Sequence, residues 1–433
     1  MTRPARIALY GGGGAPYHHA ALFARAGHRI DFVFPVDIAN GRLRAYDAFV
    51  MPGGGYRAMS GQIDPLGHEG ARTIREYVRR GGMYIGSCAG SYDAATVPAS
   101  FVAACPAQAD LCLLSARIWN ETGTSWVGLQ SPGVGVLRAR NVAPTHPVMD
   151  GMPEVFDIVH YNGPLFRGGE ALATVDGPTE RFTPAEQFLT TTMTRTLIDD
   201  AAVDGVANIV VGRLGQGRVV LFGSHPEFGF SLSMTDPQLP ARMLENAIRW
   251  QIEESGARDD DSIDIVAHAQ AVPMDDVGKR AIRLLGQIRE RCAGLYVRDG
   301  NGPGWLQRSY AMSTFGLTPQ EIWAVALDEM QRLAETIEQR VQDVDPWVLA
   351  FRQPTEWDLD GGFHGVVALL EQAEQMLGQA CAHWSLDLGA PSADPYAFAS
   401  TSPYHLVAGS YLAAIGRLAS AALLCEAYQR VPA

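Results

Sequence analysis

The stretch "GGMYIGSCAGSYDA", residues 81–94, decides how the first part of this chain folds. Two glycines close a helical pattern, a short apolar run follows, and a single cysteine then stands between two further glycines. A strand that runs into a tight turn and a helix is the context of a nucleophile elbow, in which a strained turn presents one side chain above the edge of a sheet. Cys88 is therefore the first candidate for a chemical role, and a buried structural cysteine is the alternative.

Short apolar runs and helical patterns alternate on both sides of this stretch. The apolar runs predict buried strands at residues 6–10, 29–34, 46–51 and 82–87. The patterns between them predict helices at residues 16–27 and 66–82. Further strands are predicted near 113–119 and 154–160, with a hairpin over "LGQG" (214–217) and a closing helix over 236–255. This order predicts an α/β fold with a doubly wound, mostly parallel sheet of the flavodoxin type.

An acidic, polar stretch separates this part from a helical one. "SGARDDDSID" (255–264) has the composition of a linker. Long helical patterns follow it at residues 317–341, 361–384 and 402–428, the first opening with a capping box formed by Thr318 and Glu321. We therefore predict an α/β domain at 1–255, a linker at 256–264 and an all-α helical domain of unassigned role at 265–433.

The composition excludes several classes of function. The chain has 433 residues and a net charge of −13, which argues against broad electrostatic binding to nucleic acid or to an anionic membrane. No apolar stretch is long enough for a signal peptide or a membrane span, so we expect a cytoplasmic protein. The six cysteines include no CxxC pair, which argues against a zinc ribbon and against a thioredoxin-like site.

No cofactor and no metal site are predicted. The only lysine, Lys279, would have to carry any pyridoxal phosphate, and it is followed by Arg280, so no P-loop is encoded. In the helical part, His364 and Glu371 lie two turns apart, about 10 Å along one helix, which is too far to share a small ion. The same reasoning treats the neighbouring candidates as solvated or core side chains: Glu374, His383 and His405.

A second motif supplies partners for Cys88. "GSHPEFG" (223–229) ends a predicted strand, so His225 and Glu227 also lie at a carboxyl strand end. A thiol nucleophile needs a base, and the base needs a group that fixes its tautomer and stabilises its cation. Taken alone, the tripeptide is better explained as a surface turn. Two motifs at matching strand ends favour a Cys88–His225–Glu227 triad.

A third motif offers amide donors for a developing oxyanion. "VMPGGGY" (50–56) is again a strand that runs into glycines. The candidate donors are Gly53 and Gly54, together with Ala89 just after the cysteine. A turn that needs positive φ explains the glycines equally well, and the two explanations are compatible.

The stretch "YGGGGAPYHHA" (10–20) is a weaker signal. It lacks the G-x-G-x-x-G spacing of a dinucleotide site, so we interpret it as a tight strand-to-helix turn. Amides of Gly12 and Gly13 are candidates to bind a substrate carboxylate beside Cys88. Tyr10, His18 and His19 are candidates to line the same pocket, although a solvated helix start explains the two histidines equally well.

Residues 5–253 resemble the class I glutamine amidotransferase-like superfamily, with its elbow cysteine and H-x-E pair. Within it they are most similar to the N-terminal-type domain of biotin-protein ligases (BPL_N-like). The matching stretches are "MPGGGY" (51–56), "GGMYIGSCAGSYDA" (81–94), "YNGPLF" (161–166) and "GQGRVVLFGSHPEFG" (215–229). The resemblance implies an amidotransferase-like fold with Cys88 as nucleophile. No catalytic biotin-ligase portion follows, so biotinylation is not inferred.

One departure bears on the substrate. Members of the superfamily that use glutamine often carry Gln two residues after the second elbow glycine, where this chain has Tyr92. We therefore expect a cysteine-dependent hydrolase or amidase that cleaves a C–N acyl bond of a small molecule through a thioester, with Tyr92 among the substrate-binding residues.

Two alternatives remain open. One is a glutaminase component that supplies ammonia to a partner synthetase, and the other is a non-catalytic binding or regulatory module on the same scaffold. The expected partner is a small-molecule amide, with no nucleic acid and no membrane. A partner synthetase and a homo-oligomer stay open.

Overall fold

A computed structural model describes residues 3–54, 62–121, 128–184, 196–228, 238–255, 274–296, 319–352, 362–383 and 403–429. These residues fall into two compact units. The first holds a β-sheet with its helices up to residue 255, together with Gly362 and Phe363, and the second holds the helices that follow residue 273. The predicted linker at 256–264 lies outside the described residues.

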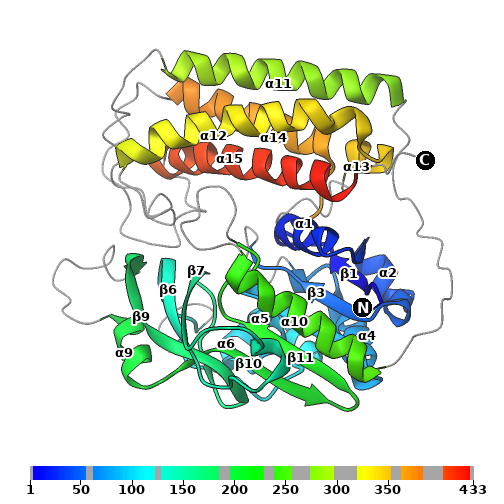
Figure 1. Cartoon of the computed structure of the whole chain (residues 1–433), viewed down its shortest axis with the longest axis vertical. Helices are drawn as coiled ribbons and strands as arrows, with labels where there is room; N and C mark the ends of the chain where they lie inside the picture. Colours follow the sequence, from blue (N-terminus) through cyan, green and yellow to red (C-terminus); the bar gives the residue numbers. More distant parts are fainter. Residues whose placement is uncertain are drawn as a thin grey trace. The chain divides into compact units, whose positions relative to one another are not determined.

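One half of the sheet is parallel, as the sequence predicted. Its strands lie in the order β2-β1-β3-β4-β11, and each neighbouring pair is parallel. Their bounds are Arg6–Tyr10 (β1), Arg29–Val33 (β2), Ala48–Met51 (β3), Met83–Ser87 (β4) and Gly217–Phe222 (β11). The doubly wound α/β fold is confirmed (Figure 1).

The other half of the sheet is antiparallel and only partly foreseen. It continues from β11 in the order β10-β9-β6-β7, while β8 pairs with β10 and with β5. The bounds are Arg117–Ile118 (β5), Gly133–Asn141 (β6), Val155–Tyr161 (β7), Phe166–Arg167 (β8), Glu170–Pro184 (β9) and Ala207–Leu214 (β10). The hairpin between β10 and β11 is confirmed. β9 could not be recognised in the sequence because Gly177 and Pro178 interrupt it, and both residue types normally break a strand. A register shift in its pairing with β6 accommodates them.

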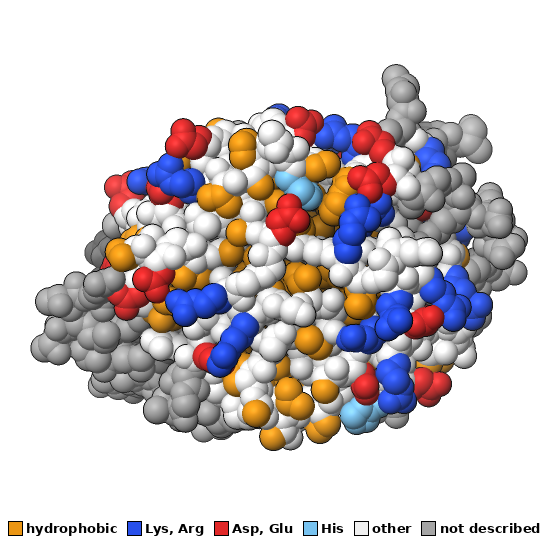
Figure 2. Space-filling model, turned by 90° about the horizontal axis from the view of Figure 1, so that it is seen from below, with side chains coloured by type: hydrophobic (Ala, Val, Ile, Leu, Met, Phe, Trp, Pro, Cys, Tyr) orange, Lys and Arg blue, Asp and Glu red, His pale blue; other side chains and the backbone are white. Residues whose placement is uncertain are grey.

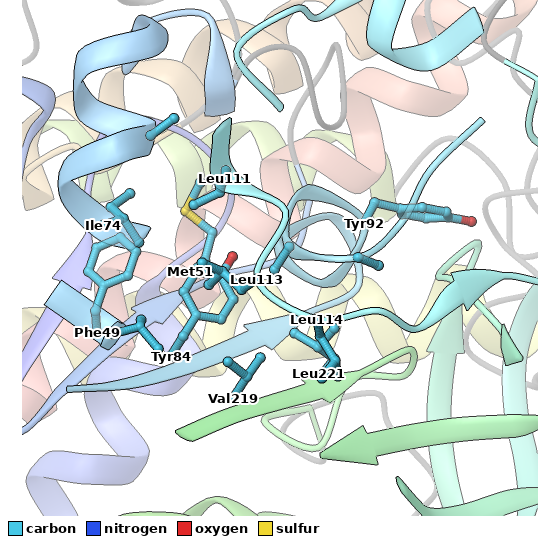
Figure 3. Close-up of a cluster of buried hydrophobic side chains, with 14 of the residues drawn as sticks. Phe49, Met51, Ile74, Tyr84, Tyr92, Leu111, Leu113, Leu114, Val219 and Leu221 are labelled. Carbon is cyan, nitrogen blue, oxygen red and sulfur yellow. The ribbon is translucent and has the colours of Figure 1, made fainter. Parts of the chain in front are cut away.

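The parallel strands are buried on both faces. Alternate residues of β1 point to opposite faces, and Ala8, Tyr10, Ile7 and Leu9 are all 0% exposed. On one face, strand side chains pack with Ile74 of α4 in the cluster of Figure 3. Burying a side chain such as Ile74 stabilises the fold by about 2 kcal/mol. The helices near this cluster are α2 (Pro35–Ala39), α4 (Gly67–Arg79), α5 (Ala89–Ala94), α6 (Ala99–Ala104) and α7 (Gln108–Leu111).

Two further helices, α1 (Tyr17–Arg25) and α10 (Gln238–Ser255), complete this unit with α9 (Leu197–Val203) and the short turns η1 (Arg42–Ala45) and η2 (Pro147–Met149). His28 lies just after α1, and its Nε2 atom is 3.3 Å from Oε2 of Glu245 of α10. Buried apolar side chains line both helices, among them Phe23 and Leu244. Both predicted helices are therefore confirmed, with ends within a few residues of those expected.

The second unit consists of helices, as predicted. They are α11 (Met274–Tyr296), α12 (Pro319–Arg340), α13 (Pro346–Ala350), α14 (Val366–His383) and α15 (Pro403–Ala427), with a 3-10 turn η5 (Val341–Asp343). α14 packs on α15 and α11, and α12 packs on α15. Thr318, the predicted N-cap of α12, lies outside the described residues. None of the helices in the described parts of the chain is both long and apolar enough to span a membrane.

Charges of both signs share the surface. On the face shown in Figure 2, acidic and basic side chains lie interspersed with apolar ones. The acidic excess of the chain is therefore not gathered into one negative field on this face.

Candidate functional site

Cys88 occupies a strained turn between β4 and α5. Its φ is 48° and its ψ is −108°, a conformation that costs a non-glycine residue about 1–3 kcal/mol. Hydrogen bonds hold it there: the Cys88 amide donates to Phe222 O at 2.9 Å, and the amides of Ser91 and Tyr92 donate to Cys88 O at 2.9 and 3.1 Å. Such strain persists only where the surroundings fix it, and it is concentrated at functional sites.

Both elbow glycines are required by close packing. A Cβ atom on Gly86 would lie 2.6 Å from the carbonyl oxygen of Gly90, and one on Gly90 would lie 2.2 Å from that of Met51. Neither position has room for a side chain. The G-x-C-x-G spacing therefore reflects the way in which α5 folds back against β4 and β3.

His225 and Glu227 form a buried pair at the end of β11. The Nδ1 atom of His225 lies 2.7 Å from Oε1 of Glu227, and the two side chains are 3% and 1% exposed. The His225 amide donates to Val159 O at 2.8 Å, which fixes the turn against β7. Because Nδ1 faces the carboxylate, Nε2 is the nitrogen left for another partner.

Gly53 brings Cys88 and His225 together. A Cβ atom on Gly53 would lie 2.6 Å from Cε1 of His225 and 2.8 Å from Cβ of Cys88. Both side chains therefore rest against the same glycine, which follows β3. The structure places three sequence candidates from three strand ends at one point of the sheet edge.

The charges at this point favour an imidazolium. Burial alone would lower the pKa of His225, but Glu227, Cys88 and the hydrogen bonds to both raise it from 6.5 to about 10. Burial would raise the pKa of Glu227, but His19 and His225 lower it from 4.5 to about 2. At neutral pH the pair is thus an imidazolium beside a carboxylate. Such a cation stabilises a neighbouring thiolate, which is the reactive form of cysteine.

His19 is a member of the site whose role the sequence left open. Its Nε2 atom lies 3.6 Å from Oε2 of Glu227 and 3.2 Å from Oγ of Ser87. The side chain is 0% exposed, so the explanation as a solvated helix start is wrong for His19. Burial lowers the pKa of His19 despite the nearby Glu227. The available signal was its place in the first turn of α1, the helix that follows β1, because reactive groups gather at the carboxyl ends of the strands in such sheets.

An aromatic ring that the sequence analysis did not consider packs on the base. The ring of Phe228 stacks on that of His225, with centroids 4.3 Å apart and an interplanar angle of 2°. His18 meets Phe228 edge-on at 4.7 Å, and burial lowers the pKa of His18 to about 4. The stacked ring of Phe228 thus covers one face of the imidazole and restrains its plane.

Tyr92 ties the elbow helix to the "YNGPLF" stretch. Its hydroxyl donates to Asn162 O at 3.3 Å and accepts from Nδ2 of Asn120 at 2.7 Å. Sγ of Cys88 lies 3.3 Å from the carbonyl oxygen of Tyr161. Two of the stretches that carry the family resemblance therefore meet beside Cys88.

The remaining glycine candidates differ in position. Gly54 is exposed, with φ 84°, while the carbonyl of Gly53 accepts from the Ala15 amide at 2.8 Å. Ala89 is the first residue of α5, where the amides have no acceptor within the helix. Gly12 and Gly13 are both buried, and a Cβ atom on Gly12 would meet Tyr10 Oη at 2.4 Å. It is Gly14 whose Cβ position approaches the Gly53 loop, 2.9 Å from Gly53 O.

No group of three metal-ligating side chains is found within the described residues. In the helical unit, Glu371 pairs with Arg280 and Arg352, and Glu374 pairs with Arg291. These carboxylates are engaged by guanidinium groups instead of facing an ion. The side chains of His383 and His405 lie outside the described ones.

Comparison with solved structures found similar chains at low identity. A cytoplasmic protein from Salmonella typhimurium is 14% identical, with 57% of this chain and 98% of that chain covered and a TM-score of 0.36. A ThuA-like protein from Bacteroides uniformis is also 14% identical, with 58% and 93% covered and a TM-score of 0.36. The PurLQS structure from Thermotoga maritima is 12% identical, with 58% and 99% covered and a TM-score of 0.38.

The search of curated proteins returned no match. A family model does match: residues 44–101 fit the family described as "Biotin-protein ligase, N terminal". This stretch contains β3, the Gly53 loop, β4 and Cys88. The match confirms that the part of the chain that carries the elbow is similar to the N-terminal domain of biotin-protein ligases.

Proposed function

We propose that this protein is a cysteine-dependent hydrolase that cleaves a C–N acyl bond of a small molecule through a thioester. The observation that carries the proposal is the packing of Cys88 and His225 against Gly53, with Glu227 on the far nitrogen of the imidazole. Nucleophile, base and orienting carboxylate are the three parts that thiol acyl transfer needs. The strained backbone of Cys88 supports the same interpretation.

The reaction follows from these positions. The Cys88 thiolate attacks the substrate carbonyl carbon, and the amides of Ala89, Gly53 and Gly54 stabilise the oxyanion that forms. The C–N bond then breaks, and the proton on Nε2 of His225 goes to the leaving amine. His225, now neutral, takes a proton from water, whose oxygen attacks the thioester. The acid leaves, and the thiolate–imidazolium pair is restored. Glu227 stays ionised throughout.

A glutaminase component that supplies ammonia to a partner synthetase is the second candidate. The elbow cysteine and the H-x-E pair favour it, because in these motifs the chain resembles the class I glutamine amidotransferase-like superfamily. Tyr92 argues against it, because its ring stands where glutamine-using relatives often carry Gln. On this alternative, glutamine is hydrolysed and its hydrolysis rises when a synthetase is added.

A substrate panel tests the proposal. Purified protein is incubated with small amides, glutamine among them, and amine release is followed while the Cys88 peptide is examined by mass spectrometry for an added acyl group. We expect release by the wild type and a loss of about 1,000-fold or more in Cys88→Ala. If no amide is turned over and Cys88→Ser binds the same small molecules with unchanged affinity, the protein is a binding module and the hydrolase proposal is wrong.

A further inference from the structure

A segment from far along the chain closes over the Gly-rich loop that follows β1. The amide of Gly362 donates to the carbonyl of Gly14 at 2.8 Å, and the amide of Phe363 donates to that of Gly11 at 2.9 Å. In return, the hydroxyl of Tyr17 donates to Gly362 O at 2.9 Å. Gly362 and Phe363, named here the strap, are thus hydrogen-bonded to both ends of the loop.

The strap is also packed into the core of the first unit. Phe363 is 0% exposed, and its ring stacks on that of Phe32 with centroids 3.9 Å apart and an interplanar angle of 19°. Tyr17 and Phe34 contribute further ring contacts at 6.3 and 6.4 Å. A Cβ atom on Gly11 would lie 2.8 Å from Cε1 of Phe34 and 3.3 Å from Cβ of Phe363, so the glycine makes room for both rings. The strap therefore completes this end of the sheet.

The place of the strap in the fold is the one where ligands commonly bind. The strand order reverses between β1 and β3, and in doubly wound sheets the crevice outside the carboxyl ends at such a point usually receives a ligand. The Gly-rich loop is one wall of that crevice. Here Gly362 and Phe363 of the same chain are hydrogen-bonded to the loop.

The inner face of the loop meets the candidate site. A Cβ atom on Gly14 would lie 2.9 Å from Gly53 O, and the amide of Ala15 donates to the same oxygen at 2.8 Å. Gly53 in turn contacts both Cys88 and His225. An uninterrupted series of contacts therefore leads from the strap to the pair: Phe363 and Gly362, then Gly11–Ala15, then Gly53.

We propose that Gly362 and Phe363 are positioning residues for Cys88 and His225. They touch neither side chain but fix the Gly-rich loop, and through it the position of Gly53. The inference rests on the proposed function, since it concerns the reactivity of Cys88. It also gives the residues after 353 a role in the first unit: they supply a part of the site's support that residues 1–255 lack.

The test uses the full-length protein and two strap variants that act differently. Phe363→Ala removes the ring, while Gly362→Ala strains a backbone with φ 85° without removing apolar surface. Phe363→Leu is the conservative variant, and Phe101→Ala, which removes a 1% exposed ring from α6, is the matched control. Each variant is compared at a temperature at which circular dichroism shows it folded. The readouts are Cys88 alkylation by iodoacetamide across pH and hydrogen exchange of the peptides that cover residues 11–15 and 53–54.

We expect both strap variants to slow Cys88 alkylation at neutral pH by about 10-fold, because shifts on the order of 1 Å in a reactive pair have effects of up to about 100-fold. Exchange at the two loops should speed up in the same variants, with Phe363→Leu and Phe101→Ala close to the wild type. The inference is overturned if the alkylation rate of wild-type Cys88 depends on His225 but both strap variants leave that rate unchanged. If wild-type Cys88 shows no dependence on His225, the proposed function fails instead, and unchanged loop exchange then overturns the strap as well.

Discussion

The carboxylate of Glu227 has a second imidazole beside it: Nε2 of His19 lies 3.6 Å from Oε2, the oxygen that does not face His225. This separation is longer than a hydrogen bond, so the contact is electrostatic. Burial lowers the pKa of His19 despite the neighbouring Glu227. Glu227 is held from both sides.

His19→Leu should destabilise the protein and His19→Gln much less. Leucine removes the buried hydrogen bond between Nε2 of His19 and Oγ of Ser87, and a buried polar group that loses its partner costs about 1–3 kcal/mol. Glutamine keeps an N–H donor. The free energy of unfolding in urea, with Cys88 alkylation as a second readout, measures both variants. Equal midpoints for His19→Leu and wild type would show that the contact has no energetic role.

Gly53→Ala should disable the pair without straining the backbone. Its methyl group would lie 2.6 Å from His225 Cε1 and 2.8 Å from Cys88 Cβ, closer than carbon atoms approach, so the two side chains must separate. We expect Cys88 alkylation at neutral pH to fall by about 10-fold or more.

Gly54→Ala is the matched control for that change. A methyl group there meets Ala15 at 3.5 Å, which is ordinary contact, but the φ of 84° makes the substitution cost about 1 kcal/mol of stability. This variant should lose stability and keep its Cys88 reactivity. If Cys88 stays reactive in Gly53→Ala and loses its reactivity in Gly54→Ala, the geometry assigned to Cys88 and His225 is wrong.

The His225–Glu227 pair should stabilise the fold in a defined pH window. The pKa of His225 is raised from 6.5 to about 10, so its contribution is complete below 6.5 and is lost as pH rises through about 10. The pKa of Glu227 is lowered from 4.5 to about 2, so its contribution is present above 4.5 and is lost as pH falls through about 2. The melting temperature of wild type should exceed that of Glu227→Gln most between pH 4.5 and 6.5.

The same comparison with Glu253→Gln, which changes an exposed carboxylate of α10, should show no such window. A difference between wild type and Glu227→Gln that is constant with pH, or largest near pH 10, would show that the pair is not ionised as described.

The buried carboxyl group of Asp93 should make the fold less stable as pH rises, which is opposite to the effect of Glu227. It lies in α5 with 0% exposure, and neither carboxyl oxygen has a hydrogen-bond partner within the described residues. Burial, with Cys88 and Asp64 nearby, raises its pKa well above 3.8. The folded state therefore keeps a proton that the unfolded state loses, and stability falls as pH rises above 3.8 by up to about 1.4 kcal/mol per pH unit.

Asp93→Asn removes this titration. The free energy of unfolding of Asp93→Asn minus that of the wild type should therefore increase by more than about 1 kcal/mol from pH 4 to pH 8. Asp157→Asn, on the exposed side of β7, is the control and should change little. A parallel pH dependence for Asp93→Asn and wild type would mean that Asp93 is not the titrating group.

The sequence could predict those parts of the site that directly follow a recognisable strand. Cys88, His225 and Gly53 each follow an apolar run, and parallel strands bring their carboxyl ends to one edge. The orienting contact of Glu227 follows from its place two residues after His225. Strands β6 and β9 were missed because glycine and proline interrupt their pattern.

The remaining features depend on tertiary packing. Whether His19 points at Glu227 or at solvent depends on the rotation of α1 about its axis, which hydrophobic periodicity fixes only coarsely. Phe363 lies inside the stretch 361–384 that the sequence predicts as one helix, whereas α14 begins only at Val366. No local signal indicates that Phe363 instead packs against Phe32 of β2. Gly11 and Gly14 were recognised as a turn, but the partner that their carbonyls accept from could not be found by spacing alone.

The most direct measurement is the rate of Cys88 alkylation by iodoacetamide across pH, resolved by mass spectrometry, in wild type and in His225→Gln. Cys112, half-buried near the first unit's surface, is the internal reference. The account predicts that wild-type Cys88 reacts at about pH 6 at least about 10-fold faster than Cys112, since an imidazolium partner maintains the thiolate, and that His225→Gln abolishes this advantage. A Cys88 that follows the pH profile of Cys112 and is indifferent to His225 would contradict the central claim.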